Sequence, residues 1–242
     1  MIEVRRAKER RHDHRGQQET WLTFNVQARA DPLPDGFNSL QILNECRLPP
    51  GGASPTLPHS DTEIITYLLE GSLAYDDSLG RSGVMHAGEF RLMTAGRNVR
   101  CTEKNASRGD WARVFQLWLR SRDAGLQPGH QQKRFSTAER RGGLCLVASP
   151  DARMGSLHLR EDALVYSALL ERGQHIAYDL QLGRGAWLHV VSGEVTLGDN
   201  VLGSGDGAGI SAERPVSFTA REETEILLLD LIERTVQLTR VV

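Results

Sequence analysis

The sequence predicts an all-β protein in which one chain of 242 residues forms two antiparallel β-barrels of the jelly-roll type. Three observations support this fold class. Apolar segments are of strand length and are separated by turn formers. The chain contains 24 glycines, many for its length, and few segments with the helical period. The two halves of the chain also repeat one pattern of strands and glycines.

The first half carries six strand-length segments. They are 21-WLTFNV-26, 39-SLQILNECRL-48, 63-EIITYLLEG-71, 72-SLAYDD-77, 89-EFRLMTAG-96 and 114-VFQLWLR-120. Turn formers lie between them, as in 32-PLPDGF-37 and 79-LGRSG-83. These segments predict the strands of a first barrel.

A polar segment, 121-SRDAGLQPGHQQKRFSTAERRGG-143, comes next and is interpreted as a connector. Strand-like segments then resume. They are 144-LCLVA-148, 156-SLHLR-160, 164-LVYSALL-170, 186-AWLHVV-191 and 224-TEILLLDLI-232. We therefore expect two domains, residues 1–140 and residues 141–242, with the boundary near residue 140.

The repeat links the two halves. The segments 67-YLLEGSLAY-75 and 84-VMHAGEF-90 resemble 189-HVVSGEVTL-197 and 201-VLGSGDGAGI-210, and the pairs Gly88-Glu89 and Gly205-Asp206 each open a strand. Small barrels need glycines where the chain bends sharply between strands. A duplicated antiparallel barrel therefore fits better than a βαβ protein, which would require helical crossovers.

Composition restricts the setting. The 29 basic and 31 acidic residues nearly balance, which gives no electrostatic reason to expect nucleic acid or an anionic membrane as a partner. No apolar core segment comes after the basic residues of 1-MIEVRRAKERRHDHRG-16, and 226-ILLLDLI-232 is too short to span a bilayer. The three cysteines show no CxxC spacing. We expect a cytoplasmic protein.

Four stretches of the chain resemble the pirin family of bicupins, which includes pirin-type quercetin 2,3-dioxygenases. They are 36-GFNSLQILNE-45, 58-PHSDTEIITYLLEGSLAYDDSLG-80, 87-AGEFRLMTAG-96 and 148-ASPDARMGSL-157. The resemblance covers most of the chain. It implies two cupin barrels, with any metal site in the N-terminal barrel, and a monomer.

The resemblance also implies where that metal site would lie. The family uses a His-x-His pair and a His-x-Glu pair, which fall here on Leu57 and His59 and on Cys101 and Glu103. Leucine cannot bind a metal, and cysteine replaces a nitrogen donor with sulfur. The implied site is therefore degenerate. Counting along the repeat, the matching positions of the second barrel form no ligand cluster; they are Asp179, Gln181, Phe218 and Ala220.

These residues support two functional hypotheses. In the first, the pocket binds a small molecule or anion without turnover and without a cofactor, or responds to oxidation through Cys101; its expected lining is His59, Glu63, Arg100, Cys101 and Glu103. In the second, the protein is a metal-dependent dioxygenase acting on a flavonol. Its Fe or Zn would be held by His59, Cys101 and Glu103, with Glu63 as a candidate fourth ligand, and Glu103 would also be the candidate base.

The other histidines and cysteines give weaker signals. His12 and His14 fall in a basic segment interpreted as a mobile arm that binds metal only adventitiously. Four further histidines lack ligand spacing: His86, His158, His175 and His189. Cys46 and Cys145 lie in apolar segments and are expected to pack in the core.

Overall fold

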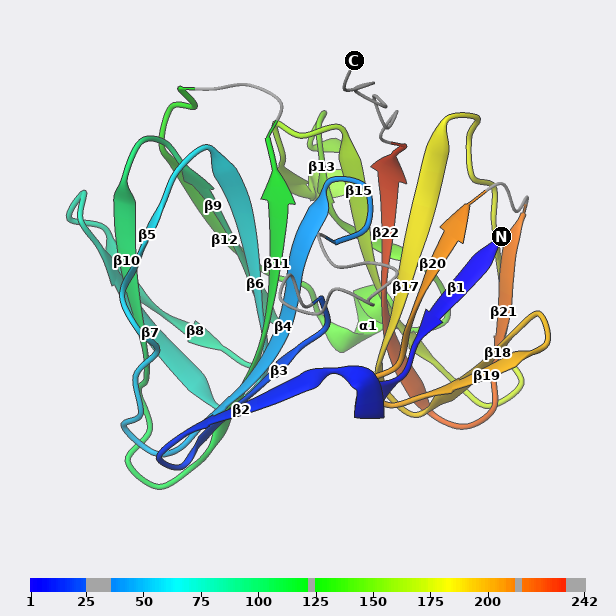
Figure 1. The fold of residues 1–242 in the computed structure, drawn as a ribbon, viewed down its shortest axis with the longest axis horizontal. Coiled ribbons are helices and arrows are strands. Elements are labelled where there is room, and N and C mark those ends of the chain that lie inside the picture. Colours follow the sequence, from blue (N-terminus) through cyan, green and yellow to red (C-terminus); the bar gives the residue numbers. More distant parts are fainter. Residues whose placement is uncertain (25–35, 122–124, 212–214, 234–242) are drawn as a thin grey trace, which may run out of the picture.

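The computed structural model describes residues 1–24, 36–121, 125–211 and 215–233, which form two jelly-roll barrels lying side by side (Figure 1). The predicted strand over 21–26 and the predicted turn over 32–37 lie partly outside these residues. No helix in the described ranges is long and apolar enough to cross a membrane. The all-β prediction is confirmed.

The first barrel pairs a seven-stranded sheet with a four-stranded sheet. In sheet order, the large sheet contains β12 (Gly129–Arg134), β9 (Glu89–Ala95), β6 (Thr62–Glu70), β11 (Ala112–Arg120), β4 (Leu40–Leu48), β3 (Gln18–Leu22) and β2 (Arg11–Arg15). The small sheet contains β5 (Leu57–His59), β10 (Val99–Asn105), β7 (Ser72–Asp77) and β8 (Ser82–His86).

The second barrel repeats this plan. Its large sheet contains β1 (Ile2–Arg5), β20 (Gly207–Ser211), β17 (Arg184–Ser192), β22 (Thr224–Ile232), β15 (Ala163–Leu170), β13 (Cys145–Ser149) and β14 (Leu157–His158). Its small sheet contains β16 (His175–Tyr178), β21 (Val216–Ala220), β18 (Glu194–Leu197) and β19 (Asn200–Gly203). The helical turns are η1 (Ala7–Glu9), α1 (Thr137–Arg140) and η2 (Arg153–Gly155).

Two predicted segments take a different form. The expected connector over 121–143 contains β12, which pairs with β9 at the edge of the first sheet, and the short helix α1. The first strand, β1, pairs with β20 and so completes the sheet of the second half, although it precedes the first barrel in sequence. Apart from β1, the division of the chain into two domains near residue 140 stays a prediction.

The glycines of the repeat behave as the sequence predicts. Gly71 and Gly193 take φ values of 82° and 85° at the equivalent turns β6–β7 and β17–β18. An added Cβ would lie 2.5 Å from the Trp111 carbonyl oxygen at Gly71 and 2.4 Å from the Glu223 carbonyl oxygen at Gly193. Both positions therefore exclude a side chain for the same two reasons, positive φ and close backbone approach.

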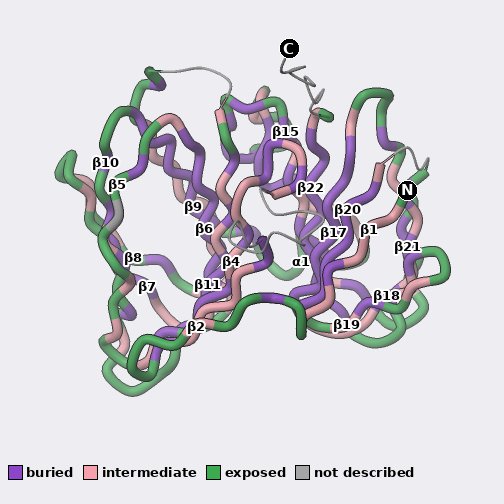
Figure 2. Tube along the Cα trace, in the orientation of Figure 1, coloured by how far each residue is buried: buried purple, intermediate pink, exposed green. Residues whose placement is uncertain are grey.

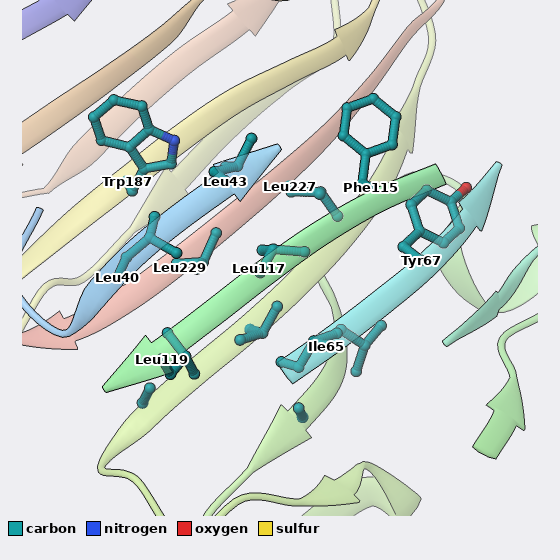
Figure 3. Close-up of a cluster of buried hydrophobic side chains, with 14 of the residues drawn as sticks. Leu40, Leu43, Ile65, Tyr67, Phe115, Leu117, Leu119, Trp187, Leu227 and Leu229 are labelled. Carbon is teal, nitrogen blue, oxygen red and sulfur yellow. The ribbon is translucent and has the colours of Figure 1, made fainter. Parts of the chain in front are cut away.

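The two large sheets pack face to face, and their facing side chains form one core between the barrels (Figure 3). Successive strand residues point to opposite faces, so on β6 the side chains of Ile65 and Tyr67 enter this core while Ile64 and Leu68 enter the first barrel. Both faces of the central strands are thus buried, as Figure 2 shows for β6, β17 and β22. This explains why 63-EIITYLLEG-71 and 226-ILLLDLI-232 are almost continuously apolar.

His189 lies in this inter-barrel core and is fully buried. Its ring lies 5.8 Å from that of Phe115, and neither of its ring nitrogens has a partner among the described residues. Burial, followed by the charges of Arg10 and Arg113, holds the pKa of His189 well below its ordinary value of 6.5. The folded protein therefore keeps this imidazole neutral.

This burial predicts a pH dependence of stability. A histidine whose folded pKa is lowered stabilises the fold above its unfolded pKa and loses that contribution as the pH falls below it. We expect the free energy of unfolding to fall below pH 6.5, with His189 contributing a slope of about 1.4 kcal/mol per pH unit. Urea unfolding of wild type and of His189→Leu, measured over the range of ~pH 5–8 in which histidine titrates, checks this. An equal acid slope in both proteins would contradict the prediction.

Candidate ligand pocket of the first barrel

A cavity of about 600 Å³ lies inside the first barrel. Side chains of the large sheet form one wall, and β5 and β10 contribute to the other. The hairpin of β2 and β3 lines the cavity too, because β3 extends the large sheet by pairing with β4. The polar residues of its lining include Thr20, Asn44, His59, Arg91, Glu103 and Gln116.

Strand β10 supplies Cys101 and Glu103 as the sequence predicts. Its burial alternates strictly, so Cys101 and Glu103 face inward with Val99 and Asn105, and both line the cavity. The same alternation places Arg100 on the exposed outer face. The prediction that Arg100 lines the pocket is therefore wrong.

Glu63 is also absent from the cavity. It shares the face of β6 that carries Ile65 and Tyr67, and it is fully buried toward the second barrel. Its carboxylate accepts hydrogen bonds from the backbone N–H groups of Arg160 and Glu161, at 2.9 and 2.8 Å. Glu63 thus ties the two halves of the chain together, and its prediction as a pocket residue is wrong.

His59 lines the cavity, as predicted, and is 8% exposed. Its ring meets that of Trp118 edge-on, with centroids 4.8 Å apart. Burial, with a further contribution from Arg91, lowers the pKa of His59, although Glu103 opposes the shift. The imidazole is therefore neutral near pH 7, and its Nδ1 has no partner among the described residues.

Sequence reasoning missed Arg91, which the structure places at the centre of the site. Arg91 lies on β9, is 1% exposed, and shares its inward face with Met93. Its guanidinium forms an ion pair with Glu103 and lies 4.2 Å from the ring centroid of Tyr75. The signal was present, since Arg91 is a lone charge inside the apolar segment 90-FRLMTA-95.

The carboxylate of Glu103 has no free oxygen. Oε1 accepts hydrogen bonds from Arg91 Nη2 and, at 3.3 Å, from the hydroxyl of Thr66. Oε2 accepts a hydrogen bond of 2.6 Å from the side-chain amide of Gln116. Removing Arg91 would leave this buried charge without a counterion.

Cys101 lies beside the same cation. Its Sγ is 3.9 Å from Arg91 Nη2. Burial raises the pKa of the Cys101 thiol to about 11, although the charge of Arg91 opposes the shift. The side chain is therefore a buried thiol at neutral pH, and this does not favour the redox-responsive hypothesis, which requires an accessible thiolate.

The residues at the implied metal site do not fit a bound cation as they stand. A buried guanidinium contacts both Glu103 and Cys101 and would repel a cation bound between them, and both oxygens of Glu103 already accept hydrogen bonds. Within the described ranges, the donor atoms of His59, Cys101 and Glu103 do not gather as closely as a shared ion requires. The backbone register also sets Leu57 directly opposite Cys101 across β5 and β10.

The rest of the lining favours an anion. Arg11, Arg15 and Arg91 oppose only Asp13 and Glu103. Arg91 pairs with Glu103 and Arg11 with Asp13, so the lining carries one excess positive charge. Cys46, which was expected in the core, is buried there and also lines this cavity.

The equivalent positions of the second barrel show no such site. Phe218 and Ala220 belong to an apolar cluster that fills this barrel. Asp179 and Gln181 lie on its exposed side.

Known proteins match this chain over nearly its whole length. The family model Pirin matches residues 4–119, and the model Quercetinase C-terminal cupin domain matches residues 146–231. A protein of Escherichia coli named quercetin 2,3-dioxygenase is 36% identical over 96% of this chain and 99% of its own. A pirin-like protein of Caulobacter vibrioides is 33% identical over 86% of this chain and 89% of its own.

A solved structure shares the whole fold. The bacterial pirin YhhW from Escherichia coli, in complex with nickel(II), superimposes with a TM-score of 0.90 at 35% identity, covering 97% of this chain and 100% of its own. Metal binding therefore occurs among relatives of this chain. In this chain an ion pair between Arg91 and Glu103 lies in the pocket. Any functional assignment must therefore account for this ion pair.

Proposed function

Because the chain belongs to the pirin family of bicupins, we propose that it is a member whose first-barrel cavity binds a small anionic or phenolic ligand without a catalytic metal. The observation that carries the proposal is the buried ion pair of Arg91 with Glu103. Within this pair the guanidinium keeps further N–H groups that could donate to a ligand, and it occupies the carboxylate that a metal would need.

Unpartnered nitrogens support the same ligand class. Buried polar atoms without partners in the described part of the chain include Nε and Nη1 of Arg91, Nε1 of Trp118 and Nδ1 of His59, and all three residues line the cavity. Arginine and tryptophan nitrogens are donors only, and a buried donor without an acceptor costs about 1–3 kcal/mol. Neighbouring side chains cover these nitrogen atoms and must shift before a ligand oxygen can reach them. A carboxylate or phenolate oxygen there would recover part of that free energy.

The volume and the mixed lining of the cavity suit an aromatic ligand that carries polar groups. Its volume of about 600 Å³ lies within the range of small-molecule sites. Apolar side chains of Ile42, Ile64, Met93 and Trp118 lie among the polar groups. A flavonol, whose phenolic oxygens surround a planar ring system, is the probe that this combination suggests.

Calorimetric titration tests the proposal, with quercetin added to protein kept in a chelator. We expect binding without oxygen uptake, and a loss of affinity of about tenfold or more in Arg91→Gln, since a hydrogen bond to a charged group contributes about 1.5–3 kcal/mol. Arg100→Gln is the matched control, because Arg100 lies on the outer face of β10. Equal affinity in wild type and Arg91→Gln would contradict the proposal.

A second candidate is flavonol oxygenation, favoured by the full-length similarity to the Escherichia coli protein named quercetin 2,3-dioxygenase. It requires Glu103 to exchange Arg91 for a metal. Oxygen uptake with quercetin by protein loaded with Fe(II) or Ni(II), abolished in Glu103→Gln, would establish this function in place of the first.

A further inference from the structure

The hairpin of β2 and β3 brings two histidines and a glutamate together at the rim of the cupin pocket, apart from His59, Cys101 and Glu103. His12 and His14 are two residues apart on β2 and so share a face of the strand. The register places Glu19 opposite His14 and Trp21 opposite His12. One ligand atom from each of His12, His14 and Glu19 lies within 4.8 Å of the others.

This arrangement corrects the expectation of a mobile arm. Arg11–Arg15 form a regular strand that pairs with β3, and β3 pairs in turn with β4 of the large sheet. The two histidines are therefore held in a fixed relation by the sheet. A chance encounter of side chains on a flexible segment would not have this register.

One oxygen of the Glu19 carboxylate lies near the nitrogens of the two histidines. Its Oε2 lies 3.8 Å from Arg47 Nη1, and its Oε1 lies 3.8 Å from His12 Nε2. Arg47 thus holds one oxygen and leaves the other toward the histidines. The nearby charge of Arg11 is paired with Asp13 at 2.8 Å.

From this geometry we propose that His12, His14 and Glu19 form a binding site for a late first-row divalent metal ion, of the Zn(II) or Ni(II) class. Two imidazoles and one carboxylate are the donors that such ions prefer, and three protein ligands leave a coordination position open. The histidines are exposed, so that open position faces solvent. His14 also lines the cavity, which places the ion at the cavity rim.

Trp21 gives the site its own reporter. The rings of His12 and Trp21 are stacked, with centroids 4.4 Å apart and planes 10° from parallel. Ni(II) bound to His12 would therefore quench Trp21 fluorescence. The other three tryptophans lie outside this hairpin, so quenching that disappears in Trp21→Phe while Ni(II) affinity remains identifies the site.

The test is titration of the full chain, purified without a histidine tag, with Ni(II) by fluorescence and with Ni(II) and Zn(II) by calorimetry. We expect one ion per chain and a loss of affinity of at least about tenfold in His12→Ala and in His14→Gln, because loss of even an outer-shell partner of a metal commonly costs 10–100-fold. His86→Ala is the matched control, an exposed histidine on β8 of the same barrel.

Two results would overturn the proposal: unchanged affinity in both His12→Ala and His14→Gln, or binding that Glu103→Gln abolishes. The second result would place the ion in the cupin pocket and so would also overturn the metal-free function. Loss of binding in the rim variants with full retention in Glu103→Gln supports the rim site. It leaves the quercetin titration to decide the proposed function separately.

Discussion

Protein carrying Leu57→His, Cys101→His and Arg91→Gln together is expected to bind Ni(II) in the first barrel about 10–100-fold more tightly than protein carrying only the two histidine replacements. The reason is electrostatic. Unit charges about 4 Å apart near a protein surface interact by about 4 kcal/mol, so a guanidinium beside Glu103 strongly opposes a divalent cation. Restoring two histidines leaves that charge in place.

The measurement is calorimetric titration with Ni(II) on a background of His12→Ala and His14→Ala, which removes the proposed rim site. Gln is chosen at position 91 because it is neutral and keeps a polar amide that can donate a hydrogen bond. If the double and triple variants bind Ni(II) equally, Arg91 does not exclude the metal. Stoichiometric Ni(II) binding by protein that carries only His12→Ala and His14→Ala would contradict the proposal of a metal-free pocket as well.

Replacement of Arg140 by alanine is expected to lower the free energy of unfolding by about 3–5 kcal/mol, the usual cost of leaving a buried charge unpaired. Arg140 Nη1 donates to Glu225 at 2.7 Å, to the Tyr67 hydroxyl at 2.8 Å and to Ser167 at 3.2 Å. Tyr67 lies in the first barrel and the other two partners in the second. The Arg140 side chain, 7% exposed, thus joins the two barrels through charged hydrogen bonds.

The neighbouring residue provides the control. Arg141 pairs with Glu171 at 3.2 Å, but the two side chains are 59% and 67% exposed. Exposed pairs of this kind contribute about 0–1 kcal/mol, so Arg141→Ala should be nearly silent in urea unfolding. If Arg140→Ala lowered the free energy of unfolding by less than about 3 kcal/mol, or by as much as Arg141→Ala does, the role assigned to the buried cluster would be contradicted.

The structural role of α1 explains why this contact was not predicted. The helix begins with a capping box, in which Ser136 and Glu139 exchange hydrogen bonds between their side chains and backbone N–H groups. This fixes the turn that directs Arg140 inward. In sequence, 134-RFSTAERRGG-143 resembles any polar connector, because nothing local distinguishes Arg140, which is buried, from Arg141, which is exposed.

Strand alternation decided which of the predicted pocket residues line the cavity. His59, Cys101 and Glu103 were placed correctly because the family motif fixes their strands, and residues two apart share a face. Arg100 and Glu63 were wrong for the same physical reason. Arg100 is one residue out of phase on β10, and Glu63 shares the face of β6 that meets the other barrel.

The sequence by itself determined the all-β fold, its duplication and the glycines at the strand turns. Each of these depends on local backbone conformation, on side-chain periodicity or on a motif within one strand pair. Only the tertiary structure decided which charges meet: Arg91 with Glu103 in the pocket, Arg140 with Glu225 between the barrels, and His14 with Glu19 at the rim. These contacts depend on sheet register and on which face of a strand is turned inward. A charged residue in a strand shows its partner only when the strands have been paired.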